Sequence, residues 1–122
     1  MQVELALARS RVDDVADLRV SARLTNDSAD PVALNMDFLS MPALVLQVKD
    51  ESDAPVPLGP PPVPPLEISR EDLPAGESVR FSYHGIFGSP PPAGTYYIRF
   101  YFRDEAPVGV LRSSWTRFTV LG

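Results

Sequence analysis

The stretch PAGTYYIRFYFR, residues 92–103, decides the fold class of this chain. Behind the Pro-Ala-Gly turn, apolar and aromatic side chains occupy every second position, which is the period of a β-strand with one buried face. A helix would instead repeat its apolar residues at every third and fourth position. The inward residues are expected to be Tyr96, Ile98, Phe100 and Phe102, and the outward residues Tyr97, Arg99, Tyr101 and Arg103.

Tyr96 carries a second signal because it opens this strand just behind a glycine turn at Gly94. A tyrosine at the start of the penultimate strand is typical of the tyrosine corner of Greek-key sandwiches, in which the hydroxyl bonds to the backbone a few residues upstream. We expect such a bond from Tyr96. The alternative is a core aromatic residue whose hydroxyl reaches water.

Shorter runs of the same kind recur along the chain and are separated by clusters of turn-forming residues. No window shows a sustained helical period, and the acidic stretch at residues 11–17 is expected to be a hairpin loop. About seven short strands at this spacing predict an all-β protein, an immunoglobulin-like sandwich of two antiparallel sheets with Greek-key topology. The remaining expected strands cover residues 3–7, 18–24, 32–34, 44–48, 78–83 and 116–120, with 44–48 as a central strand.

Length and composition fit one domain over residues 1–122. The 14 prolines favour loops and short strands, and the net charge of -5 argues against general nucleic-acid binding. No apolar run approaches the roughly 20 residues of a membrane span. The chain has no cysteine and its start lacks the pattern of a signal peptide, which together favour a cytoplasmic location.

Four segments carry a family resemblance: LTNDSADPVAL, LVLQVKDESD, LPAGESVRFSY and PPAGTYYIRFYF. In their turn and core pattern they resemble the bacterial intracellular proteinase inhibitors and their immunoglobulin-like relatives. The resemblance covers roughly residues 18–103 and implies the sandwich fold, with inhibition of a protease by a presented loop as the implied function. The chain departs from that family in its proline-rich loop at residues 55–65 and in an aromatic strand at residues 115–120.

Two loops are candidate contacts with a partner. The segment Phe87-Gly88-Ser89-Pro90-Pro91 is the loop that an inhibitor would present, with Phe87 and Pro90 as its candidate residues. The proline-rich loop must be extended, and it could dock on an aromatic-lined domain through Pro60, Pro61 and Pro62. The alternative for this loop is a stiff connection between the two sheets.

Catalytic and metal chemistry find no support in the residue pattern. His84 is the single histidine, so no histidine metal set is formed, and no Gly-x-Ser-x-Gly nucleophile elbow is present for it to serve as a base. The acidic clusters at residues 13–17 and 50–53 lack the glycine and terminal glutamate of an EF-hand loop and are expected to be solvated. We therefore expect no catalytic residue, no metal ligand and no cofactor.

The outward residues of the penultimate strand suggest a binding face. If residues 115–120 form the closing strand beside it, Trp115 and Arg117 share the same outer surface. Val45, Gln47 and Lys49 of the central strand would extend this surface, whereas the other sheet carries no outward aromatic residue. The candidate face comprises Tyr97, Arg99, Tyr101, Arg103, Trp115 and Arg117.

Tyr, Trp and Arg are enriched in the hot spots of protein interfaces. The sequence thus predicts a non-catalytic protein-binding or assembly module that engages another protein through this face. One alternative is a proteinase-inhibitor-like protein that presents a loop. A more conservative interpretation is that these side chains simply cover an exposed sheet by stacking across strands.

Overall fold

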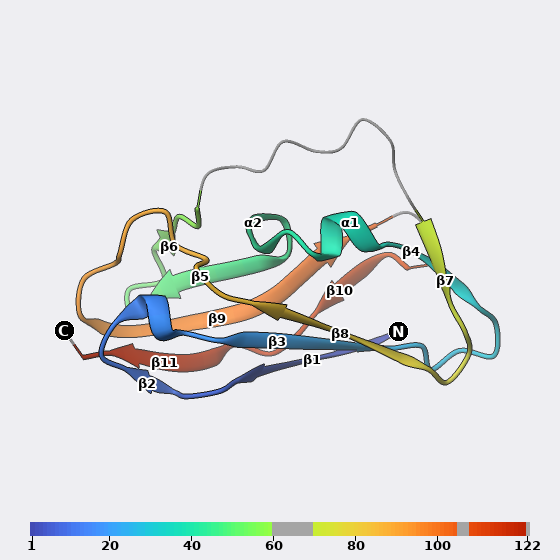
Figure 1. Ribbon diagram of the computed structural model, residues 1–122, viewed down its shortest axis with the longest axis horizontal. Helices are drawn as coiled ribbons and strands as arrows, with labels where there is room; N and C mark the ends of the chain where they lie inside the picture. The colour runs from blue at the N-terminus through green and yellow to red at the C-terminus, as the bar shows by residue number, and fades with distance from the viewer. Residues whose placement is uncertain (60–69, 105–107, 122) are drawn as a thin grey trace.

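The computed structural model describes residues 1–59, 70–104 and 108–121. The strand predicted at residues 94–103 is β9, Gly94–Arg103, and it lies at the centre of the largest sheet (Figure 1). β9 pairs antiparallel with β5, Leu46–Asp50, on one side, and with β10, Val110–Arg112, and β11, Thr116–Val120, on the other. Two short strands complete the edges of this sheet, β6 at Pro55–Val56 and β2 at Arg11–Val12.

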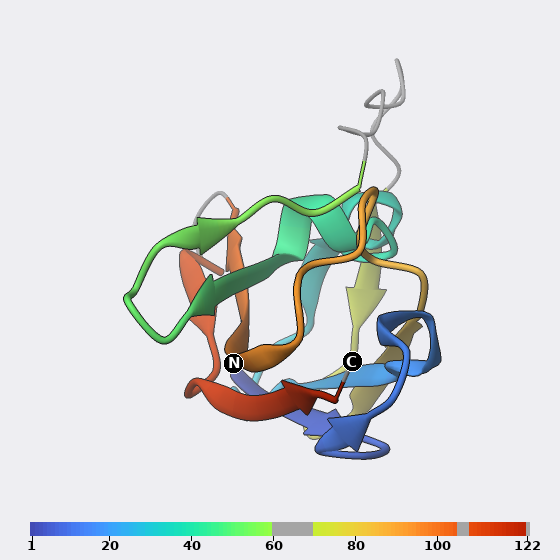
Figure 2. The same cartoon turned by 90° about the vertical axis from the view of Figure 1, so that its left-hand side faces the viewer.

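A three-stranded antiparallel sheet forms a second layer, in the order β1-β3-β8. Viewed from one end, β5 and β6 lie on one side of the molecule and the first strands of the chain on the other (Figure 2). A two-stranded sheet, β4-β7, lies at one end of these layers. The bounds are Gln2–Leu7 for β1, Val20–Thr25 for β3, Ser78–Tyr83 for β8, Val32–Asn35 for β4 and Arg70–Leu73 for β7.

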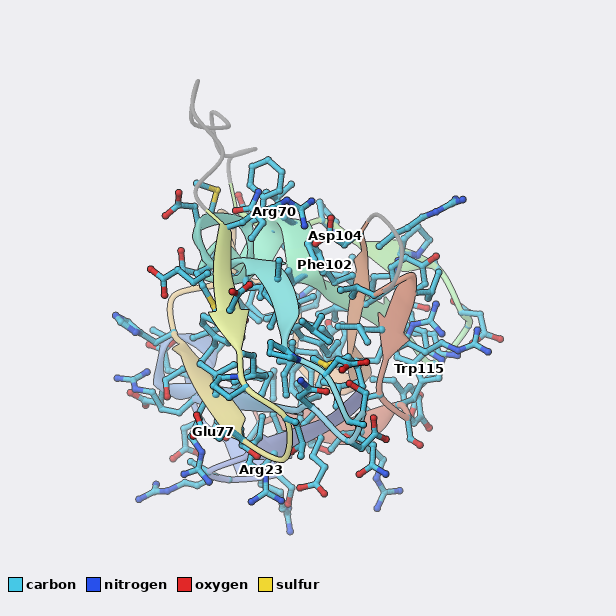
Figure 3. The ribbon with its side chains drawn as sticks, turned by 90° about the vertical axis from the view of Figure 1, so that its right-hand side faces the viewer. Arg23, Arg70, Glu77, Phe102, Asp104 and Trp115 are labelled. Atoms are coloured by element: carbon cyan, nitrogen blue, oxygen red, sulfur yellow. The ribbon has the colours of Figure 1, made fainter. Side chains whose placement is uncertain are left out.

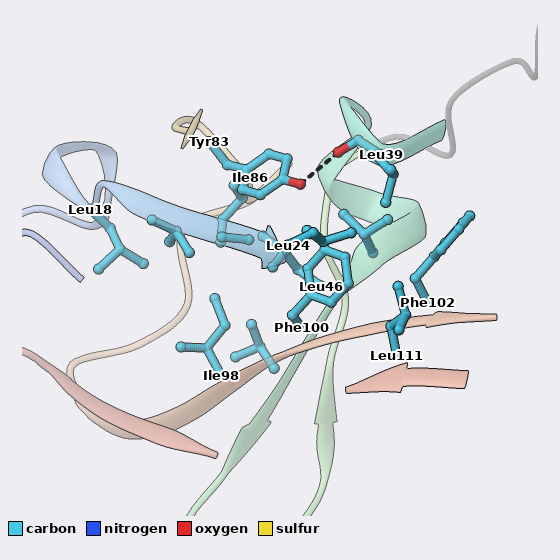
Figure 4. Close-up of a cluster of buried hydrophobic side chains, with 14 of the residues drawn as sticks. Leu18, Leu24, Leu39, Leu46, Tyr83, Ile86, Ile98, Phe100, Phe102 and Leu111 are labelled. Atoms are coloured by element: carbon cyan, nitrogen blue, oxygen red, sulfur yellow. Dashed lines mark hydrogen bonds between the residues drawn. The ribbon is translucent and has the colours of Figure 1, made fainter. Parts of the chain in front are cut away.

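The hydrophobic core fills the space between the two layers. Leu18 and Leu24 from the β3 side face Ile98 and Phe100 from β9 (Figure 4), and all four are at most 1% exposed. The inward phase predicted for β9 is confirmed, because each of its four inward residues is buried. Buried apolar area of this kind is the main favourable term in folding.

Two buried tyrosine hydroxyls donate to backbone carbonyls. The Tyr96 hydroxyl donates to the carbonyl of Pro92, four residues upstream, which confirms the bond predicted from the glycine turn. The Tyr83 hydroxyl donates to the Leu39 carbonyl across the core (Figure 4). Each hydroxyl thereby has the hydrogen-bond partner that the polar group of a buried side chain requires.

The segment before β5 differs from its prediction. Residues 44–48 were expected to be one continuous strand, but Pro42–Val45 forms a single helical turn, α2, that follows another, α1 at Met36–Leu39. Proline at the first helical turn has a suitable φ, and the Asn35 side chain caps α1 by accepting from the Phe38 amide. The central strand therefore begins only at Leu46.

The structure confirms an all-β protein and changes three details of its plan. The described ranges hold eleven strand segments against about seven expected, including the two-residue pieces β2 and β6. Residues 11–17, expected to be a hairpin loop, contain β2 and a 3-10 turn, Val15–Asp17, capped by the Asp14 side chain. β2 pairs parallel with β11, so the expectation of purely antiparallel sheets is wrong at this edge.

Candidate functional site

The outer surface of the large sheet carries the predicted residues in three rows across its strands. Directly paired residues of an antiparallel sheet point to the same side, so each row follows from the register. The outward residues Tyr97, Arg99 and Tyr101 are half-buried, whereas Arg103 and Arg117 are exposed. The rows are Arg117–Tyr97–Lys49, then Arg99–Gln47, then Arg112–Tyr101, with Arg103 beyond them.

Trp115 contacts cations from two strands of this surface. The Lys49 ammonium nitrogen and the Arg99 guanidinium carbon each lie 4.4 Å from the centroid of its ring. The same two cations contact tyrosines, with Arg99 5.3 Å from the Tyr101 ring and Lys49 5.7 Å from the Tyr97 ring. Such contacts attract a cation to the negative face of the ring. We call Lys49, Tyr97, Arg99, Tyr101 and Trp115 the aromatic-basic cluster.

Hydrogen bonds to β9 fix the position of Trp115. It lies in the short connection between β10 and β11, where Ser113 donates its amide to the Phe100 carbonyl and its hydroxyl oxygen accepts from the Phe100 amide. Trp115 lies on the flank next to β10 and β11, well apart from Arg23 of β3 and from Glu77, which precedes β8 (Figure 3). The serine anchor was not anticipated, because it depends on pairing between residues 13 positions apart.

The two cations of the cluster are oriented by polar neighbours. Arg99 donates from Nε to the Gln47 side-chain oxygen at 2.8 Å, and Lys49 forms a 2.8 Å salt bridge with Asp53. Asp53 lies in a turn organised by Asp50, which accepts from the Ser52 hydroxyl and from the Ser52 and Ala54 amides. These bonds hold the pKa of Asp50 below its usual range, and the bond from the Ser52 hydroxyl has the largest effect.

A pocket of about 560 Å³ adjoins the cluster. Lys49, Gln47 and Trp115 belong both to its lining and to the outer surface of the sheet. Its other walls are mainly apolar and come from α2, β5, β6 and the chain that follows β6. They are Ala43, Leu44, Leu46, Val48, Asp53, Pro55, Val56, Leu58 and Gly59.

Two features of this surface differ from the sequence prediction. Val45, expected to extend the outer face, is fully buried at the end of α2. Arg112, which pairs with Tyr101, was missed because Val110–Arg112 was not recognised as a strand. The alternation of Val110, Leu111 and Arg112, with Leu111 alone buried, is the signal that could have found it.

Of the two candidate loops, the structure describes residues 87–91 and the first part of the proline-rich loop, residues 55–59. Phe87 is half-buried and packs on the core, with its ring centroid 6.4 Å from that of Phe118. Pro90 is exposed in the same loop. Pro60, Pro61 and Pro62 lie outside the described residues. Phe87 is thus an anchor of its loop, and the exposed part of the loop is Gly88, Ser89 and Pro90.

The described part of the chain contains no group of three His, Asp or Glu side chains placed to hold a metal ion. His84 is exposed and follows the end of β8. None of the helices in the described ranges is long and apolar enough to cross a membrane. No family model matches this chain, and no curated protein shows significant sequence similarity to it.

Proposed function

We propose that this chain is a non-catalytic protein-binding or assembly module, and that its outer sheet face docks another protein. The aromatic-basic cluster carries the proposal. Tyr, Trp and Arg side chains dominate the energetics of protein interfaces, and here they gather around one tryptophan on one face. Their mutual contacts reduce the side-chain freedom that would otherwise be lost on binding.

We further propose that the scaffold is an immunoglobulin-like sandwich with Greek-key topology. Two observations support this assignment. The order β1-β3-β8 corresponds to strands A, B and E of that fold, and β11-β9-β5 to strands G, F and C. Tyr96 at the start of β9 makes the upstream backbone bond of a tyrosine corner. A sandwich of this kind presents two flat outer faces, of which one carries the cluster.

The opposite outer face serves as an internal comparison. Its aligned residues Glu4, Arg23 and Arg80 form one row, in which Arg23 and Glu4 make a 2.7 Å salt bridge. The neighbouring outward positions are Ala6, Ser21 and Ser82, and no aromatic side chain lies among the outward residues of β1, β3 and β8. This second face therefore carries charged, polar and small side chains without aromatic residues, and substitutions on it can serve as a control.

The alternative of a protease inhibitor receives less support from the geometry. An inhibitory loop must offer a side chain to the enzyme, whereas Phe87 packs against Phe118. A serine protease panel separates the two proposals, because a binding face on the sheet predicts no dose-dependent inhibition.

A matched pair of double variants tests the docking proposal. Immobilised wild-type protein, R99A/R117A and R23A/R80A would be incubated with lysate of the native host, and captured proteins compared by quantitative mass spectrometry. Both double variants lower the net charge by the same amount, so general electrostatics is controlled. We expect at least one protein that is retained by wild type and R23A/R80A and lost by R99A/R117A. Equal retention by all three would contradict the proposal.

A further inference from the structure

The pocket beside Trp115 has an identifiable origin in the path of the backbone. Pro57 follows β6 and cannot donate to a ladder, so the pairing with β5 stops at Val56. The chain then turns away, and the Gly59 amide donates to the Ile86 carbonyl at 2.8 Å. The Leu46 amide is taken by the Pro42 carbonyl. The space between β5 and Leu58 is therefore a pocket lined by side chains. A partner could not extend the sheet here by pairing with the Leu46 amide, because the Pro42 carbonyl already accepts from it.

The chemistry of the pocket selects an apolar side chain. Its charged groups, Lys49 and Asp53, neutralise each other at 2.8 Å. The Gln47 side-chain oxygen is already engaged by Arg99. Few polar groups remain to fix a polar ligand, and an apolar group gains by leaving water for these walls. Leu44, 38% exposed, is one of the walls that such a group would cover.

The surface next to the pocket favours charged groups of a partner, in contrast to the apolar pocket. Four arginines point outward on this face, and within the described ranges none of them forms a salt bridge. The chain as a whole carries a net charge of -5, so this face is basic against an acidic background. Such a patch attracts carboxylates and disfavours cationic partners. The four residues are Arg99, Arg103, Arg112 and Arg117.

We infer that the partner presents an acidic peptide segment with one apolar anchor residue. This inference rests on the proposed docking function and adds the chemistry of the partner. The anchor enters the pocket against Trp115, and flanking Asp or Glu side chains lie along the arginines of β9, β10 and β11. Tryptophan and arginine side by side give one contact that is both apolar and charge-selective.

Selection from a library of random twelve-residue peptides displayed on phage tests the inference without a known partner. Enriched sequences would be synthesised, labelled with fluorescein and titrated by fluorescence anisotropy. The pocket variants are L44Q and L58Q, the charge variant is R99Q/R117Q, and the control is R23Q/R80Q. Circular dichroism and Tm establish folding of each variant, and two pocket variants are used so that one unfolded protein does not decide the result.

We expect enriched peptides that combine an apolar residue with several carboxylates. Binding should weaken about tenfold in R99Q/R117Q and in a folded pocket variant, as loss of a hot-spot contact does. It should also weaken with salt in wild type, because exposed charges are screened, and remain unchanged in R23Q/R80Q.

Four results would overturn the inference in distinguishable ways. Peptides that depend on the arginines but bind both pocket variants like wild type would rule out the apolar anchor residue and leave the docking function supported. Peptides without carboxylates, or no enrichment at all, would remove the acidic segment. Peptides that bind all variants equally would remove both proposals. A concentration-dependent dimer that R99Q/R117Q dissociates, seen by light scattering, would assign the face to a second copy instead.

Discussion

The guanidinium carbon of Arg99 lies 4.4 Å from the centroid of the Trp115 ring, and the Lys49 ammonium nitrogen lies at the same distance. The two cations come from neighbouring strands, β9 and β5, whereas the ring belongs to the connection between β10 and β11. Three segments far apart in sequence therefore meet at one indole. Because Trp115 is the single tryptophan of the chain, its fluorescence reports on this cluster alone.

Iodide should quench Trp115 more strongly relative to caesium than it quenches free N-acetyltryptophanamide at matched ionic strength. The net charge of -5 predicts the reverse, so a preference for the anion would reveal the local potential of Lys49 and Arg99. In K49Q/R99Q the preference for iodide should fall, whereas the control R23Q/R80Q, with the same change in charge, should keep it. The slopes of Stern-Volmer plots give the quenching constants of the two ions for each protein. An iodide-to-caesium ratio at or below that of N-acetyltryptophanamide would contradict the described cluster.

Replacing Tyr101 and Trp115 together by alanine should weaken partner capture and lower the free energy of unfolding by about 2 kcal/mol, because three cation–π contacts worth about 0.5–1 kcal/mol each are lost. Both side chains are only half-buried and lie outside the core. Urea unfolding followed by circular dichroism measures the stability. The core variant F100A offers the contrast, with an expected loss of about 3–5 kcal/mol. A comparable loss in Y101A/W115A would show that these residues are structural.

The alternation of β9 was sufficient to predict its buried and outward sides, and the register with β11 placed Arg117 beside Tyr97. The same reasoning failed at Val45, because an apolar run of this length fits a helical turn as well as a strand. The pocket was beyond prediction. It requires the Gly59 amide to find the carbonyl of Ile86 far along the chain, and no local pattern records such a bond.

Asn26→Ala should lower the free energy of unfolding by about 3 kcal/mol, since a buried group left without its partner costs about 1–3 kcal/mol. Asn26 is fully buried, and its amide nitrogen donates to the carbonyls of Asp30 and Leu73 at 2.9 Å. Its oxygen accepts from the amide and hydroxyl of Ser28. The milder control Ser28→Ala removes only the hydroxyl. Urea denaturation compares the two variants, and equal losses would contradict the central role of Asn26.

Alkaline pH should destabilise the protein through Tyr83. Burial raises the pKa of its hydroxyl, which donates to the Leu39 carbonyl, so the folded state favours the neutral form. The unfolded tyrosine ionises near pH 10, and above that pH the unfolded state releases a proton that the folded state retains. Stability is thus fully present below pH 10 and declines as pH rises further.

The variant Tyr83→Phe separates this effect from general alkaline unfolding. At neutral pH it should lower the free energy of unfolding by about 1–2 kcal/mol, because the buried Leu39 carbonyl loses its donor. Above pH 10 the variant should lose less additional stability than the wild type, since it has no hydroxyl to ionise there. Chemical denaturation at a series of pH values measures both slopes. Parallel slopes for the two proteins would assign the alkaline loss of stability to other groups. Tyr96 is the first of these to test, by Tyr96→Phe, because burial and, to a smaller extent, the charge of Asp50 raise the pKa of its hydroxyl.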